Sequence, residues 1–109
     1  MATMIESPKA LVYKASWHLD KGLPHATKYS AMSKFFASDV AMKITTDAVQ
    51  ILGGDGYLKS GNLERTMRDA KITQIYEGTN QLKRFVMAEQ LVKKFLEKYG
   101  MGRDWSEFL

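Results

Sequence analysis

The sequence predicts an all-α protein, an antiparallel up-and-down bundle of about four helices. Apolar residues recur every three or four positions along most of the chain, as on one face of an amphipathic helix. Residues 26–52 contain neither glycine nor proline, and no segment shows the sustained alternation that is typical of a strand. The breaks between helical segments are short, so consecutive helices are expected to pack against each other.

The first helical segment lies before the break at Gly22-Leu23-Pro24. Its apolar face runs from Met4 to Leu19, and Pro8 leaves its start open. In one alternative Ser7 caps a helix that begins at Pro8, because proline suits the first helical position. In the other, a longer helix runs through Pro8 and is kinked there.

The remaining helices are expected at residues 26–52, 63–75 and 80–99. One glycine of the Gly53-Gly54 pair is expected to form a left-handed cap, and residues 53–62 are expected to be a loop. Asn62 and Thr79 are the expected N-caps of the last two helices. Residues 1–100 would form one domain and residues 101–109 a tail, in which Asp104 and Glu107 have capping-box spacing.

Composition excludes several classes of protein. The chain has 109 residues and no cysteine, which rules out a disulfide scaffold and a cysteine nucleophile. Its net charge of +4 is spread over both halves, as on a solvated helical surface, so nucleic-acid binding is not expected. No apolar run reaches the roughly 18 residues of a membrane span, and no secretory signal is visible.

Few residues are candidates for chemistry. His18 and His25 have no acidic partner at ligand spacing, so no metal site is expected. The glycines between Gly53 and Gly61 follow a helix rather than a strand, which favours a cap and loop over a phosphate site. Glu77 lies at a junction of two helices, where burial beside apolar residues would raise its pKa and suit it to act as a base. From the residues alone, an exposed loop carboxylate is the favoured alternative.

Two ordered blocks change that balance. Residues 46–54 read TDAVQILGG and residues 67–80 read MRDAKITQIYEGTN. In sequence and spacing they resemble the C-terminal helical domain of the acyl-CoA dehydrogenases, and looser resemblance covers most of the chain. The resemblance implies an FAD-dependent oxidoreductase that converts an acyl-CoA to the trans-2-enoyl-CoA. It implies that Glu77 is the base that removes the α-proton, and that Tyr76 and Gly78 line the acyl and thioester pocket.

The same resemblance implies two groups of cofactor-binding residues. Gln50, Gly53 and Gly54 match the family segment that contacts FAD of a neighbouring subunit, and glycine lets the backbone approach the cofactor closely. Thr79 and Gln81 match positions that touch FAD at a helix N-terminus, where N–H groups favour a pyrophosphate.

The resemblance also implies that the chain is the last part of a larger subunit. An N-terminal helical domain, a middle β domain and the first helix of the C-terminal domain would be missing from it. We therefore expect the chain alone to be inactive, colourless and self-associating through its helical faces. The complete enzyme would be a homo-oligomer, a dimer or tetramer, with electron-transfer flavoprotein as its acceptor. It would lie in the bacterial cytoplasm or the mitochondrial matrix.

Overall fold

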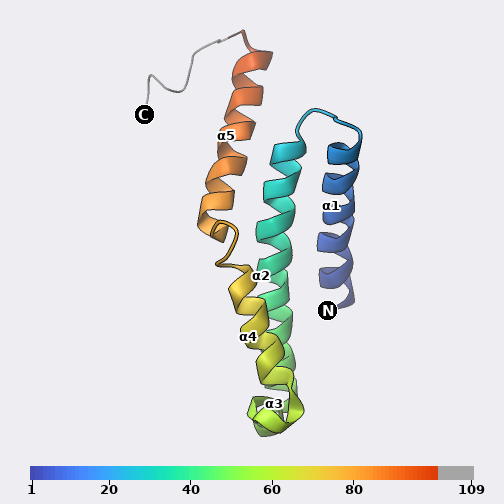
Figure 1. Cartoon of the computed structure of the whole chain (residues 1–109), viewed down its shortest axis with the longest axis vertical. Coiled ribbons are helices and arrows are strands. Elements are labelled where there is room, and N and C mark those ends of the chain that lie inside the picture. Colours follow the sequence, from blue (N-terminus) through green and yellow to red (C-terminus); the bar gives the residue numbers. More distant parts are fainter. Residues whose placement is uncertain (101–109) are drawn as a thin grey trace.

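The structure is a computed structural model and describes residues 1–100; the expected turn at Asp104 and Glu107 lies outside them. The described residues form helices and no strand, which confirms the all-α prediction (Figure 1). The elements in order are α1 (Ala2–Asp20), α2 (Ala26–Leu52), α3 (Gly54–Tyr57), the 3-10 turn η1 (Lys59–Gly61), α4 (Leu63–Thr73) and α5 (Asn80–Lys98).

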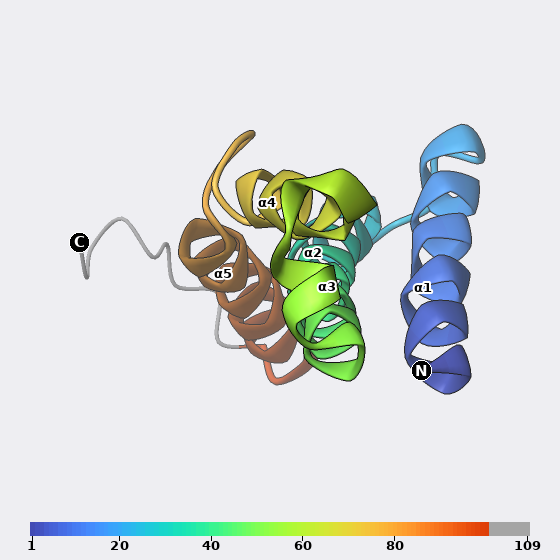
Figure 2. The same ribbon diagram turned by 90° about the horizontal axis from the view of Figure 1, so that it is seen from below.

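Helix α2 is the central element, and every other long helix packs against it. Figure 2 shows α1 on one side of α2, and α4 and α5 on the other. All three run antiparallel to α2, with α4 and α5 one after the other along its length (Figure 1). Helix α1 has no contacts with α4 or α5, so α2 alone holds the described layers together.

Helix α1 begins at Ala2 and continues through Pro8, which confirms the longer of the two expected helices. Ser7 is therefore not an N-cap; its hydroxyl donates to the carbonyl oxygen of Thr3 at 2.8 Å. Pro8 is buried, and its missing N–H costs the helix one backbone bond. The helix ends at Asp20, and Gly22 just beyond it has a φ of 61°, at which a side chain would strain the backbone.

The segment after α2 is more ordered than the expected loop, since residues 53–62 contain α3 and η1. Gly53 has the expected positive φ of 61°, but its ψ of −137° lies outside the left-handed helical region, so the predicted cap geometry is wrong. Gly56 is buried against the end of α2, where an added Cβ would lie 2.8 Å from the Val49 carbonyl oxygen. The small glycine surface lets α3 fold back onto α2.

The caps of the last two helices differ from each other. Asn62 occupies the N-cap position of α4 but makes no capping hydrogen bond with its side chain. Thr79 caps α5 as predicted, because its hydroxyl accepts from the Leu82 N–H at 3.3 Å. Helix α4 ends at Thr73, two residues earlier than expected, and the chain then enters the loop that carries Glu77.

The described layers enclose very little apolar volume. The buried apolar side chains are small, namely Ala15, Ala31, Val40 and Ala70. The molecule is elongated and measures 58 × 31 × 19 Å. Large side chains assigned to the apolar faces remain exposed, among them Leu19, Ile51, Leu82, Phe85 and Phe95. Helices α1 and α5 each pack on one helix only, so these faces have no partner within residues 1–100.

Candidate active site

The candidate active site is the loop between α4 and α5. Glu77 and Gly78 both have positive φ, 53° and 84° respectively. That conformation is uncommon for a residue with a side chain, and it persists only where surrounding contacts enforce it. The Asn80 N–H closes the loop by donating to the Gln74 carbonyl oxygen at 3.0 Å. Glu77 therefore sits near the apex of a tight corner.

This corner borders an open groove of about 440 Å³ between α2 and the end of α4. Its lining is mainly apolar, and Lys34 provides a cation on the α2 side. Tyr76 and Glu77 line the groove and are exposed. The structure thus brings together Tyr76, Glu77 and Gly78 as expected. It does not provide the burial of the Glu77 carboxylate on which the expectation of a raised pKa depended. That burial would have to come from substrate or from further protein.

A polar cluster beneath the corner was missed by sequence reasoning. Its centre is Asn80, the first residue of α5, whose exposed fraction is 2%. The Asn80 side-chain amide donates to Ser38 Oγ at 2.8 Å and to Asp39 Oδ1 at 2.7 Å. Asp39 is also bonded by Gln74 and Arg84, so the cluster ties α2 to both flanking segments.

Lys34 joins this cluster to the corner itself. Its ammonium donates to the Gly78 carbonyl oxygen at 2.7 Å and to Asn80 Oδ1 at 2.6 Å. Burial lowers the pKa of Lys34 below its usual value, the positive charge of Lys83 lowers it further, and Asp39 partly offsets both. The one available sequence signal was a polar interruption of the α2 apolar stripe at Lys34 and Ser38.

The expected cofactor residues lie in two separate places. Gln50, Gly53 and Gly54 lie where α2 ends, at the bottom of Figure 1. Thr79 and Gln81 lie where α5 begins, beside Asp39 of α2. The eleven residues from Asp39 to Gln50 span about 16 Å along the helix. Within one chain, the two groups are therefore not brought together.

Both places have features that fit a bound nucleotide. An added Cβ on Gly54 would meet nothing within 4 Å, so this backbone is open to close approach from outside. Gln81 is exposed in the first turn of α5, where backbone N–H groups point out of the helix end. The Thr79 hydroxyl already accepts from Leu82, which leaves its proton free for another acceptor.

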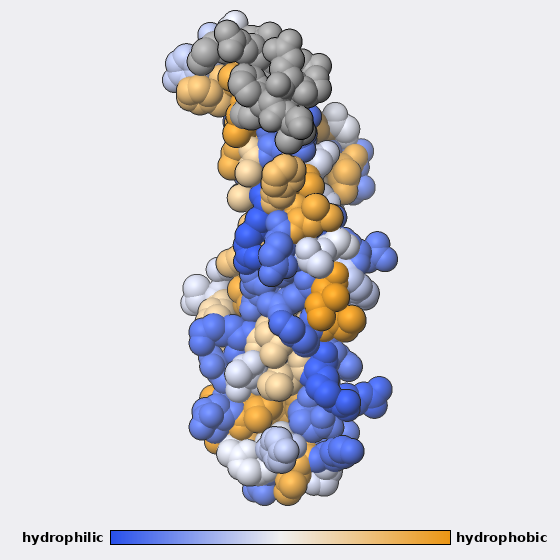
Figure 3. All heavy atoms as spheres, turned by 90° about the vertical axis from the view of Figure 1, so that its left-hand side faces the viewer, coloured by the Kyte–Doolittle hydropathy of each residue, from blue (hydrophilic) through white to orange (hydrophobic). Residues whose placement is uncertain are grey.

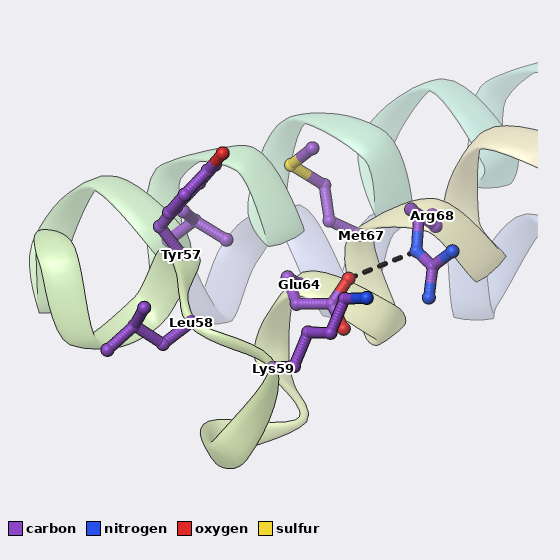
Figure 4. Close-up of a pocket in the computed structure, with 7 residues that line it drawn as sticks. Tyr57, Leu58, Lys59, Glu64, Met67 and Arg68 are labelled. Atoms are coloured by element: carbon purple, nitrogen blue, oxygen red, sulfur yellow. Dashed lines mark hydrogen bonds and ion pairs between the residues drawn. The ribbon is translucent and has the colours of Figure 1, made fainter.

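A second groove of about 440 Å³ lies between the end of α2, the α3 corner and α4 (Figure 4). Its lining includes Val49, Leu58 and Met67. The carboxylate of Glu64 is paired with Arg68 at 3.0 Å, as the dashed line in Figure 4 marks. Because the Glu64 carboxylate is already bonded to Arg68, this groove is a weaker candidate for base catalysis than the Glu77 corner.

Residues 1–100 contain no candidate metal site. Histidine and acidic residues there form no group of three or more that could hold a metal ion. The Nδ1 atom of His18 lies 2.8 Å from the carbonyl oxygen of Lys14, a contact within its own helix. None of the described helices combines the length and the apolar character needed to cross a membrane.

The fold and the site together define a helical domain that presents a carboxylate on a strained corner. The sequence profile of the acyl-CoA dehydrogenase C-terminal domain matches residues 1–92. The chain therefore belongs to the acyl-CoA dehydrogenase family, which confirms the resemblance. It spans about a quarter of the length of the curated relatives that it matches, since the matched segment covers 24% of each of them.

Three relatives illustrate the match. Cyclohex-1-ene-1-carbonyl-CoA dehydrogenase of Geobacter metallireducens is 53% identical over 92 residues, covering 84% of this chain and 24% of that protein. The butyryl-CoA dehydrogenase structure from Megasphaera elsdenii gives a TM-score of 0.80 at 49% identity, covering 84% of this chain and 24% of that one. A chain in a structure described as the electron transferring flavoprotein of Acidaminococcus fermentans gives 0.79 at 56% identity, with the same coverage.

Proposed function

We propose that this chain is the C-terminal, base-bearing part of an FAD-dependent acyl-CoA dehydrogenase. The observation that carries the proposal is the corner Tyr76-Glu77-Gly78, which holds a carboxylate over an open apolar groove. Such a groove suits an acyl chain, and a carboxylate at its edge suits removal of a weakly acidic proton. The position of Tyr76 and Glu77 at this groove supports the proposal.

In the proposed reaction, a Glu77 carboxylate oxygen takes a proton from Cα of the acyl thioester. A hydride leaves Cβ, and the electrons of the Cα–H bond form the double bond of the trans-2-enoyl-CoA. Bound FAD supplies the acceptor for that hydride. The backbone N–H of Glu77 is the proposed donor to the thioester carbonyl oxygen, where it would stabilise the charge that develops. Tyr76 and Gly78 would line the pocket on either side.

The proposed cofactor contacts follow the two separate places. Thr79 and Gln81 would contact FAD beside the Glu77 corner. Gln50, Gly53 and Gly54, about 16 Å further along α2, would contact the FAD of a neighbouring subunit, as the resemblance to the family implies. This division is the reason to propose a homo-oligomer, a dimer or tetramer, for the complete enzyme. Electron-transfer flavoprotein is the proposed electron acceptor, a choice supported by the name of the Acidaminococcus structure.

A hybrid enzyme tests the proposal directly. In it, residues 1–92 of this chain replace the matching segment of Megasphaera elsdenii butyryl-CoA dehydrogenase. We expect the hybrid to retain flavin and to lose its flavin absorbance when butyryl-CoA is added without oxygen, as the unmodified host does. A folded, flavin-loaded hybrid whose absorbance does not change would contradict the proposed function.

The exposed apolar surface supports a second candidate function, a helical association module without activity of its own. Figure 3 shows hydrophobic patches on the face that carries α5, separated by polar groups. Phe85 and Phe95 on this helix are 61% and 53% exposed. Apolar patches of this kind usually mark surfaces that bind another protein.

We expect the 109-residue chain alone to self-associate and to be colourless. Light scattering after gel filtration should give a mass well above the 12.4 kDa of one chain. Replacing both Phe85 and Phe95 with glutamate should shift the chain towards monomer, whereas Lys94→Glu on the same helix should not. A stable monomer of the unaltered chain would argue against this surface as an association site.

A further inference from the structure

The most deeply buried polar side chain of the core belongs to Asn80, one residue after the N-cap of α5. Its exposed fraction of 2% is lower than that of every buried apolar side chain of the core. A buried amide is costly unless its groups are hydrogen-bonded. Helix capping does not explain a buried asparagine at position 80, because Thr79 already supplies the N-cap of α5.

All polar atoms of the Asn80 side chain have partners. Its nitrogen donates its two hydrogens to Ser38 Oγ and Asp39 Oδ1, and the Phe35 carbonyl oxygen lies 3.2 Å from it. Its oxygen accepts from Lys34 at 2.6 Å. All four partners lie on two consecutive turns of α2, so the amide fixes the start of α5 against one place on α2.

Asp39 is itself held from two sides. Gln74, at the end of α4, donates to Asp39 Oδ1 at 2.8 Å. Arg84, one turn along α5 from Asn80, is paired with Asp39 Oδ2. Gln74 and Arg84 therefore orient the Asp39 carboxylate that accepts from the Asn80 amide. Both ends of the Glu77 loop are attached to this one Asp39 side chain.

The cluster reaches the loop itself through Lys34. Its ammonium donates at 2.7 Å to the carbonyl oxygen of Gly78, the residue that follows Glu77. The positive φ values of Glu77 and Gly78 are not favoured locally, so contacts outside the loop have to maintain them. The Lys34 bond and the closure from Asn80 N–H to the Gln74 carbonyl are such contacts.

We infer that Asn80 and Lys34 are positioning residues for Glu77. Together they hold the Gly78 carbonyl and the loop ends against α2, and so they determine the position of the Glu77 carboxylate. The inference rests on the proposed function of Glu77. Asn80 is not part of the groove lining, and Lys34, which lines the groove on the α2 side, has its ammonium bonded to the Gly78 carbonyl oxygen. Their effect is on the geometry of proton removal, which is sensitive to displacements of about 1 Å.

The test uses the hybrid enzyme with Asn80→Ala and, separately, Lys34→Met. We expect kcat per bound flavin to fall by roughly 10²-fold in each, while KM stays near that of the parent hybrid. Substrate deuterated at Cα should show a larger isotope effect on kcat, because proton removal becomes more fully rate-limiting. Lys34→Arg should restore much of the activity, since the guanidinium can still donate to the Gly78 carbonyl. Lys43→Met, elsewhere on α2, is the matched control and should behave as the parent.

The outcomes separate this inference from the proposed function. If Glu77→Gln is inactive but both positioning variants keep the parent kcat and isotope effect, the inference is overturned and the proposed function stands. If Glu77→Gln is fully active, both are overturned. Loss of flavin from Lys34→Met without a change in kcat per bound flavin would show a purely structural role and would also overturn the inference. If Asn80→Ala does not fold, Lys34→Met decides alone, because its side chain is only half-buried.

Discussion

Glu77→Gln in the hybrid enzyme is expected to lower kcat by roughly 10²–10⁴-fold, the range that a positioned general base contributes. Glutamine has nearly the shape of glutamate but cannot accept the α-proton. The backbone at position 77 has positive φ in either case, so the corner and its bond from Lys34 to Gly78 should persist. Flavin should therefore remain bound while its reduction by butyryl-CoA becomes very slow.

Stopped-flow measurement of flavin reduction in the absence of oxygen tests this result. Bound flavin, read from the absorbance of the protein after desalting, shows whether the variant is correctly assembled. Glu6→Gln, an exposed position in α1 that the hybrid retains, is the matched control and should leave the rate unchanged. Turnover of Glu77→Gln near that of the parent would rule out Glu77 as the base.

The second large effect is expected at the corner between α2 and α3. Gly56→Ala places a methyl group 2.8 Å from the Val49 carbonyl oxygen and 2.9 Å from Leu52 Cβ. The first of these atoms belongs to the backbone of a helix and cannot turn away. We expect a loss of about 1–3 kcal/mol in the free energy of unfolding, the usual cost of forcing an extra methyl into a packed site.

Gly54→Ala provides the matched control, because its methyl group would meet nothing within 4 Å and its φ is not in the positive region. Thermal unfolding of the 109-residue chain, followed by circular dichroism, should show a lower midpoint for Gly56→Ala and little change for Gly54→Ala. The comparison has to be made at one chain concentration, because association shifts the midpoint. Equal midpoints for the two variants would mean that α3 does not pack on α2 as described.

Sequence pattern was enough to predict the long helices, because their signals are local. The stretch without glycine or proline became α2 with the expected ends, Ala26 and Leu52. Thr79 became the N-cap of α5 because a threonine hydroxyl can reach the next turn from that position. The turns of residues 53–62 were not foreseen, since several glycines indicate a break without indicating the contacts that order it.

The candidate site also has one part that the sequence predicted and another that it did not. Tyr76, Glu77 and Gly78 were assigned from a contiguous motif, and adjacency in sequence kept them together in space. Lys34 and Asp39 lie more than 35 positions before Asn80, so no local pattern could connect them to it. The sequence motif likewise could not show that Glu77 would be exposed in residues 1–100, because burial depends on what packs over the loop.

By itself, the sequence determined the helical class, the family and the position of the proposed base, because all three are written in short-range patterns and ordered motifs. Only the tertiary structure decided that α2 is shared by every long helix and that the apolar faces of α1 and α5 lack partners within the described residues. It also decided that a buried amide and a lysine hold the Glu77 corner. Those features depend on contacts between residues far apart in the chain, whose pairing is selected by the packing of whole helices.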